Sequence, residues 1–191
     1  MTLLDLHGLQ SLRRAHLRYR EAVPAAYDEV LDEVNGRVRS RGSLGKADIG
    51  AVLLWKRLRA DTPWATSLSS MTDAAVRQIT RDAVAAVRDV AVTTVEAASN
   101  GRRALAPLPG LQHGDALASA LLVAAAPERL AVYDRRAHKA LHLLGLPLAN
   151  SRGRYGRYMA LVDELRHDLG AVDGHAWTAR EVDAALYWLG R

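Results

Sequence analysis

Apolar residues recur at helical spacing along most of this chain, and strand-like alternation of apolar and polar residues is almost absent. Between positions 46 and 60, for example, Ile49, Val52 and Leu53 are spaced so that they share one face of a helix. Several other segments repeat this pattern between turn signals. It predicts an all-α protein of about eight or nine helices, in which residues 1–191 form a single compact unit.

Turn residues and capping residues indicate where the helices in the first half of the chain begin and end. We expect a first helix near residues 9–20 and a second after Pro24, with this proline in its first turn. The sequence "DTPW" (residues 61–64) is expected to break a third helix. Thr72 should then open one long helix that reaches about Ala98 and is closed by "SNG".

The longest uncharged run, residues 116–127, has unusually small side chains and follows a Pro-Gly turn at residues 109–110. It is too short to cross a bilayer, which takes roughly 20 apolar residues. It fits a buried helix opened by Gly114 or Asp115 and closed by Pro127, and its small side chains allow neighbouring backbones to approach closely. The turn before it can direct backbone N–H groups outward, and N–H groups at a helix start favour an anion such as a DNA phosphate.

Two further helix starts have recognisable caps. Asp134 precedes "RRAHKALHLLG", where its carboxylate can accept from the first free N–H groups of a helix. Thr178 precedes "AREVDAALYWLG", and Glu181 stands three residues later, which completes a capping box. Another helix is expected between these two, over "RYGRYMALVDELRHDLG".

The composition excludes several kinds of chemistry. The chain has no cysteine, which removes disulfides, thiol nucleophiles, cysteine-ligated zinc and cysteine-held iron–sulfur clusters. The formal net charge is +5, and arginine carries it, because the lysines are only Lys46, Lys56 and Lys139. Arginine suits bidentate phosphate contacts, although an Ala- and Arg-rich chain is also typical of a GC-rich genome.

Targeting signals are not apparent in the sequence. The opening "MTLLDLHGLQSLRR" contains an early acid and lacks the sustained apolar core of a secretory signal. We therefore expect a cytoplasmic protein with no membrane partner, associated with the nucleoid if it binds DNA.

Three features follow one another in a characteristic order: "LPGL" at residues 108–111, the small-residue helix "ALASALLVAAA", and Asp134 in "AVYDRRAHKAL". In their order and spacing, roughly residues 100–145 resemble the helix-hairpin-helix DNA glycosylase superfamily, and its 8-oxoguanine glycosylase branch in particular. The resemblance implies a fold of that type, with the helix-hairpin-helix region at residues 102–126. It also implies that Asp134 is catalytic and that double-stranded DNA is bound by the hairpin residues Pro109, Gly110, Leu111, Gln112, His113 and Gly114.

The chain departs from the family at two points. Gln112 stands where the second hairpin glycine is usual, and Gly114 is displaced from it. Members that also cleave the strand carry an attacking lysine at the start of the second hairpin helix, where this chain has His113, Gly114 and Asp115. The resemblance therefore implies a monofunctional N-glycosylase that acts on a damaged base, without lyase chemistry and without a cofactor.

Cleavage of an N-glycosidic bond builds positive charge on the sugar, which a carboxylate such as that of Asp134 stabilises while it orients a water. The base must also leave the stack and enter an apolar or aromatic pocket. Candidates for the walls of such a pocket are Trp55, Trp64 and Tyr133. Candidates for a patch that follows the DNA backbone are the arginines of "SRGRYGRY", which are Arg152, Arg154 and Arg157.

Simpler interpretations exist for each of these features. Asp134 is also an ordinary N-cap, and Lys56 fits the rim of an amphipathic helix better than a displaced nucleophile. His138 and His142 have a metal-ligand spacing, but no third ligand accompanies them, so no metal site is expected. The alternative functions are a non-catalytic helix-hairpin-helix DNA-binding protein and a helical protein-interaction domain. A monomer is expected.

Overall fold

Every regular element in residues 2–59 and 61–191, which the computed structural model describes, is a helix. Ten of these are α-helices and one is a short 3-10 helix, so the prediction of an all-α fold is confirmed for these residues. The elements are α1 (Leu6–Ala22), η1 (Ala25–Tyr27), α2 (Glu29–Arg41), α3 (Lys46–Trp55), α4 (Pro63–Ser70), α5 (Asp73–Arg88), α6 (Thr94–Ala104), α7 (Ala116–Ala125), α8 (Arg135–Leu143), α9 (Arg154–Asp173) and α10 (Ala179–Leu189).

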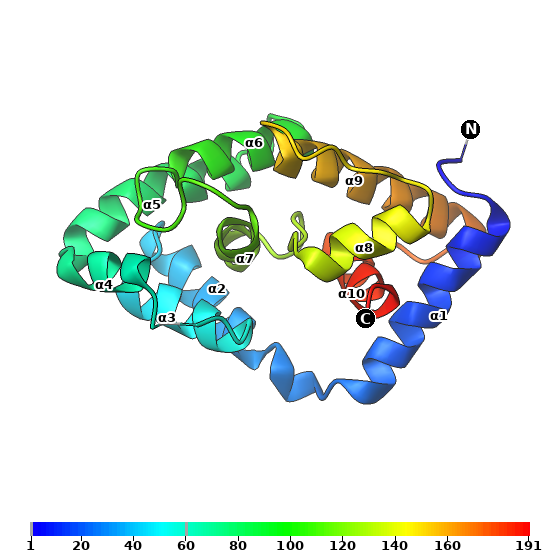
Figure 1. Ribbon diagram of the computed structural model, residues 1–191, viewed down its shortest axis with the longest axis horizontal. Helices are drawn as coiled ribbons and strands as arrows, with labels where there is room; N and C mark the ends of the chain where they lie inside the picture. The colour runs from blue at the N-terminus through cyan, green and yellow to red at the C-terminus, as the bar shows by residue number, and fades with distance from the viewer. Residues whose placement is uncertain (1, 60) are drawn as a thin grey trace.

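The helices form two groups that lie side by side (Figure 1). In the first group, α7 packs against α2, α3, α5 and α6. In the second, α10 packs against α1, α8 and α9, so that the earliest and latest helices of the chain lie together. The groups are joined where α6 lies along α9, and the chain crosses between them through η1 (Figure 1).

The centre of the first group is α7, the small-residue helix. Its residues from Ala118 to Ala125 are all buried. The packing around it is close: a Cβ added to Gly101 of α6 would lie 2.5 Å from Val87 and 3.0 Å from Leu122. The last carbonyls of α7 are satisfied by side chains, because Asn35 Nδ2 lies 3.0 Å from the Ala124 oxygen and Arg88 Nε lies 2.9 Å from the Ala125 oxygen. Small side chains thus let four helices enclose one helix.

Several predicted helix boundaries are confirmed by the caps. Asp115 is the N-cap residue of α7, and Asp134 is that of α8. Thr178 and Glu181 form the expected capping box of α10, in which the Thr178 side chain accepts from the Glu181 N–H. The helix expected over "RYGRYMALVDELRHDLG" is α9.

The prediction of a single long helix from Thr72 to about Ala98 is wrong. The chain instead forms α5 and α6, which are separated by residues 89–93. The break occurs because Thr93 caps α6: its Oγ1 accepts from Glu96 N at 3.2 Å, and its own N–H donates to Glu96 Oε2 at 3.0 Å. The helix α6 then continues through "SNG" as far as Ala104.

Two other predictions need correction in the first half of the chain. "DTPW" does not only break a helix, because Pro63 begins a further helix, α4. The described residues therefore contain more α-helices than the eight or nine expected. Pro24 is not in the first turn of α2. It precedes the 3-10 helix η1, and α2 begins only at Glu29.

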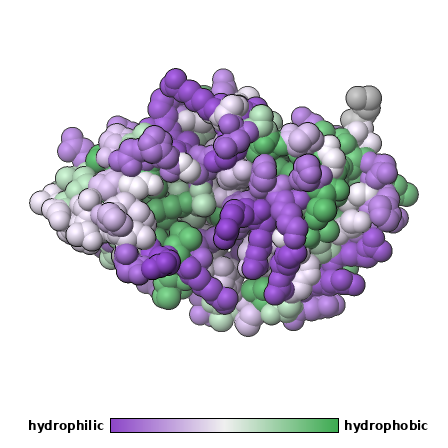
Figure 2. Space-filling model, viewed as in Figure 1, coloured by the Kyte–Doolittle hydropathy of each residue, from purple (hydrophilic) through white to green (hydrophobic). Residues whose placement is uncertain are grey.

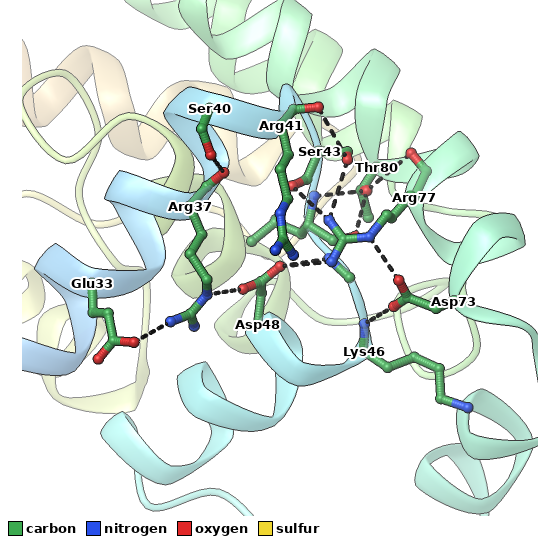
Figure 3. Close-up of polar contacts among 12 residues, drawn as sticks. Glu33, Arg37, Ser40, Arg41, Ser43, Lys46, Asp48, Asp73, Arg77 and Thr80 are labelled. Carbon is green, nitrogen blue, oxygen red and sulfur yellow. Dashed lines mark hydrogen bonds and ion pairs between the residues drawn. The ribbon is translucent and has the colours of Figure 1, made fainter.

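The turn between α2 and α3 is held by buried charges (Figure 3). Asp48 is only 1% exposed, and its Oδ1 lies 2.6 Å from Arg37 Nε, while its Oδ2 lies 3.5 Å from Arg77 Nη2 of α5. Its Oδ2 also accepts from the Gly45 N–H at 2.8 Å, at the start of α3. Arg37 donates further to Glu33 at 2.5 Å, so this arginine has a structural role rather than forming a free basic surface.

Replacement of Asp48 by alanine should lower the free energy of unfolding by about 3 kcal/mol, because two partly buried guanidinium groups lose their shared carboxylate. Chemical denaturation of both proteins measures this difference. Asp61→Ala is the matched control, since Asp61 pairs with Arg59 at the surface and its loss should leave the unfolding free energy almost unchanged. Equal effects of the two substitutions would contradict the assignment of Asp48 as the structural centre of this turn.

None of the helices in residues 2–59 and 61–191 combines the length and apolar content that a bilayer crossing requires.

Candidate functional site

The two carboxylate oxygens of Asp134 have different contacts. Its Oδ1 accepts from the N–H groups of Arg136 and Ala137, both at 2.9 Å, and so caps α8. Its Oδ2 lies 3.9 Å from Nζ of Lys56, which comes from the end of α3. The Asp134 side chain is 22% exposed. The cap therefore leaves one carboxylate oxygen available beside a lysine.

That oxygen borders a cavity of about 340 Å³ between the two helix groups, which we call the Asp134 cavity. Its walls come from α1, η1, the end of α3, the start of α8 and α10. It combines aromatic rings with charged groups of both signs. The residues around it are Tyr19, Ala22, Val23, Pro24, Tyr27, Lys56, Arg57, Asp134, Arg180, Asp183, Tyr187, Trp188 and Arg191.

The backbone after α3 positions Lys56 at the Asp134 cavity. Lys56 is the C-cap residue of α3, and the helix closes with a bond from Leu58 N to Leu53 O at 2.9 Å. Arg57 between them has a left-handed φ of 51°, a conformation that favours glycine. The Lys56 ammonium lies 5.7 Å from the ring centre of Tyr187, close enough for a cation–π contact.

A buried ion network forms the floor of the Asp134 cavity. Arg180 Nη1 lies 2.5 Å from Asp183 Oδ2, and Arg180 Nη2 lies 3.0 Å from Asp28 Oδ1 and 2.9 Å from the Tyr19 hydroxyl. Burial raises the pKa of Asp183, although Arg180 and Lys56 oppose this shift. Burial also raises the pKa of Tyr19 to about 12, so its hydroxyl stays protonated at neutral pH. The network ties α1 and α10 to the start of α2.

A second concave surface, which we call the hairpin cleft, has a volume of about 700 Å³. It lies between the hairpin that joins α6 to α7 and the loop before α9. Asp115 links these two segments, because its Oδ1 lies 2.9 Å from Arg102 Nε and its Oδ2 lies 2.8 Å from Arg154 Nε. The cationic residues around the cleft are Arg102, Arg103, Arg152 and Arg154.

The hairpin turn needs glycine at its first bend. Gly110 has a φ of 79°, and a Cβ there would lie 2.6 Å from the Trp64 ring. Pro109 and Gly110 are half-buried and Leu111 is buried, so these three residues support the turn rather than line the hairpin cleft. The cleft is lined instead by the exposed tip of the hairpin, Gln112, His113 and Gly114.

The structure brings part of the proposed DNA-binding set together. Arg152 and Arg154 face the hairpin cleft together with the hairpin tip. Arg157 does not line this cleft. Its guanidinium donates to the carbonyl oxygens of Ala149, Ser151 and Arg152, and so holds the loop before α9 in place.

The three aromatic residues proposed for a base pocket do not line the Asp134 cavity. Trp55 is buried and donates from Nε1 to Asp28 at 3.0 Å. Trp64 packs on Gly110 in the hairpin. Tyr133 is buried, its ring 4.7 Å from the Arg154 guanidinium. Because Tyr133 directly precedes Asp134, this last contact connects the hairpin cleft to the Asp134 cavity.

The rings that do line the Asp134 cavity are different ones, Tyr19, Tyr27, Tyr187 and Trp188. They come from α1, η1 and α10, and no local motif indicates that these elements meet at Asp134. Hydrophilic side chains gather over α8 beside them (Figure 2), where Arg135, Arg136 and Lys139 are exposed. The Arg136 guanidinium lies 4.5 Å from the Tyr187 ring, so this basic surface reaches the cavity wall.

No group of three or more potential metal-ligating side chains occurs in the part of the chain that the structure describes. His138, one of the two histidines with metal-ligand spacing, instead lies 3.1 Å from the Tyr133 hydroxyl through its Nδ1.

No family model, curated protein or solved structure matches this chain. The resemblance to helix-hairpin-helix glycosylases therefore rests on the residues quoted above.

Proposed function

We propose that this protein is a DNA N-glycosylase that acts on a damaged base in double-stranded DNA. The observation that carries this proposal is the open oxygen of Asp134, which borders a cavity with aromatic walls while the other oxygen caps α8. A carboxylate that served only as a cap would need neither the cavity nor the rings.

The chemistry follows from the position of this oxygen. As the bond between C1′ and the base breaks, the sugar acquires positive charge, which the Asp134 carboxylate stabilises. The same carboxylate can orient a water toward C1′. The cap bonds to Arg136 and Ala137 hold the carboxylate still, so little reorganisation is needed as the charge develops.

The aromatic rings of the Asp134 cavity suit an extrahelical base. A base turned out of the duplex loses its stacking, and stacking on side-chain rings offsets this loss. Tyr19, Tyr27, Tyr187 and Trp188 supply such rings, and Lys56 and Arg57 supply hydrogen-bond donors. Base selectivity would then depend on which base edges these donors fit.

The hairpin cleft supplies the proposed DNA-backbone contacts. Its four arginines surround the exposed hairpin tip, and the N-terminal N–H groups of α7 lie just beyond this tip. The Asp115 side chain makes no capping bond to α7, because it pairs with Arg102 and Arg154. Arginines and helix N–H groups bind phosphate without reading sequence.

A panel of duplexes, each with one damaged base, tests the proposal through release of the free base. Wild-type protein should release at least one base, and an intact duplex should remain unchanged. Binding to every duplex without release of any base would favour the second candidate, a non-catalytic DNA-binding protein. That candidate is supported by the two cap bonds of Asp134, which give this residue a structural role by themselves.

Binding to duplex DNA should weaken steeply with salt, because each neutralised phosphate releases counterions with a log–log slope of roughly −0.9 per contact. Arg152→Ala should reduce the magnitude of this slope by about 0.9 and leave the preference for a damaged base unchanged. Titrations at several salt concentrations measure the slope. Arg81→Ala is the control, since Arg81 is exposed on α5 and does not line the hairpin cleft. An unchanged slope for Arg152→Ala would remove the hairpin cleft from the DNA interface.

A further inference from the structure

The three lysines of the chain have different surroundings. Lys46 donates from Nζ to the carbonyl oxygens of Ser69 and Met71, at 2.7 and 2.9 Å. Lys139 donates from Nζ to the Arg191 carbonyl at 3.0 Å. Lys56 differs from both: its Nζ makes no hydrogen bond within residues 2–59 and 61–191, and its nearest carboxylate oxygen is Asp134 Oδ2 at 3.9 Å.

Lys56 is also the only lysine that lines the Asp134 cavity within the described residues. Its side chain is 11% exposed, and its Nζ lies 5.1 Å from the Trp55 ring centre. The chain thus keeps an amine without a hydrogen-bond partner at the wall of a cavity, beside the carboxylate assigned to the reacting sugar.

We propose that Lys56 is a nucleophile that attacks C1′ of an abasic deoxyribose in the Asp134 cavity, so that the protein also cleaves the DNA strand at abasic sites. This inference rests on the proposed function only in that the same cavity receives a DNA sugar. The hairpin has no lysine, so the sequence predicts no such chemistry, but Lys56 at the end of α3 lies 3.9 Å from Asp134.

The reaction needs no reagent besides water. In its open form an abasic deoxyribose carries an aldehyde at C1′. The neutral Lys56 amine adds to this carbon, and loss of one water gives an imine. A base then removes a proton from C2′, the electrons form a C2′–C3′ double bond, and the C3′–O bond breaks with the 3′ phosphate as the leaving group. Hydrolysis of the imine returns the free amine and an unsaturated aldehyde on the cleaved strand.

Asp134 can assist these reaction steps as well as base release. Its Oδ2 is the closest carboxylate oxygen to Nζ, so it is placed to take a proton from the ammonium before attack. Asp183 also lines this cavity, but its carboxylate is held by Arg180 at 2.5 Å. Asp134 is therefore the carboxylate best placed beside the Lys56 amine.

The test uses the full chain and a duplex with one preformed abasic site, treated with borohydride, which reduces an imine to a stable covalent link. Wild-type protein should form a covalent protein–DNA adduct, and peptide mass spectrometry should locate it at Lys56. Lys56→Arg and Lys56→Gln should lose the adduct and strand cleavage. Because Lys56→Arg keeps the positive charge, its affinity for the abasic duplex should stay within about threefold of wild type, which excludes a folding defect. Lys139→Gln is the control and should retain the adduct.

Three results would overturn the inference: no adduct although wild-type protein binds the abasic duplex, an adduct located on another amine, or an undiminished adduct in Lys56→Arg. Because the test duplex contains no base at the abasic position, the outcome does not depend on base release. An adduct at Lys56 without release of any damaged base would uphold the lyase inference and reject the glycosylase proposal. Base release without an adduct would support the glycosylase proposal and reject the lyase inference.

Discussion

Asp134→Asn should abolish base release and leave DNA affinity largely intact. The asparagine keeps a side-chain oxygen that can accept from the N–H groups of Arg136 and Ala137, so α8 should remain capped. It removes the negative charge that borders the Asp134 cavity. Loss of a few kcal/mol of transition-state stabilisation slows a reaction by roughly 10²-fold or more. Single-turnover base release and a binding titration, made on the same damaged duplex, measure the two quantities separately.

Asp134→Ala separates the catalytic role from the capping role. Alanine removes the charge and the cap together, so it should cost about 1 kcal/mol of unfolding free energy in addition to the loss of activity. Asp163→Asn is the matched control, because Asp163 is also partly exposed and paired with a cation, Arg166, but does not line the Asp134 cavity. Full activity of Asp134→Asn would reject the proposed mechanism and leave Asp134 as a helix cap alone.

The largest expected effect on stability belongs to Arg180→Met. Arg180 is the partner of the buried Asp183, and its removal leaves that carboxylate without a hydrogen-bonded counter-charge. Loss of one member of such a pair costs about 3–5 kcal/mol. Chemical denaturation at pH 7 should show this loss. Removal of Arg180 also removes its contacts with the Tyr19 hydroxyl and with Asp28. The part of α1 that lines the Asp134 cavity should therefore be less well ordered in the variant.

The cost of Arg180→Met should depend on pH with a defined sign. Burial raises the pKa of Asp183, and Arg180 is the main charge that opposes this shift, so removal of Arg180 should raise the pKa of Asp183 further. A carboxyl whose pKa is higher in the folded protein binds its proton more tightly there. Its contribution to stability is present below the unfolded pKa of about 3.9 and is lost as pH rises through the folded pKa. The difference in unfolding free energy between the variant and wild type should therefore be smallest in acid and largest at neutral pH.

A double substitution, Arg180→Met with Asp183→Leu, should recover much of the lost stability, because an apolar pair of similar volume replaces the buried ions. A double variant as unstable as Arg180→Met alone would show that the cost comes from the contacts of Arg180 with Tyr19 and Asp28 rather than from the orphaned carboxylate.

The sequence predicts local features of this protein well. The caps at Asp134 and Thr178 are confirmed, because a cap depends only on residues within one turn of it. Asp115 marks the start of α7 as expected, but its side chain pairs with two arginines instead of capping the helix. The boundary at Thr93 was missed although its Thr-x-x-Glu signal was present, because apolar residues with helical spacing lie on both sides of it. At this point the local cap ends the periodic pattern and starts a new helix.

The candidate site depends on contacts between distant segments, which local patterns do not contain. Asp134 can be identified from its position after the hairpin, but nothing near Lys56 in the sequence places it 3.9 Å from Asp134. The same holds for Tyr19 and Tyr187, which meet because α1 packs on α10. Two of the rings chosen from the sequence, Trp55 and Tyr133, are instead buried in the core.

The pairing of α1 with α10 has a consequence for the order of folding. The elements from α2 to α7 follow one another along the chain and pack mainly among themselves, so they can assemble as soon as α7 is made. The helix α1 is synthesised before α2 to α7, yet its main partner is α10, so its apolar face stays uncovered until α10 has been made. Closure of so long a loop is entropically costly and slow. The Asp134 cavity, whose walls include both helices, would therefore be among the last parts of the molecule to form.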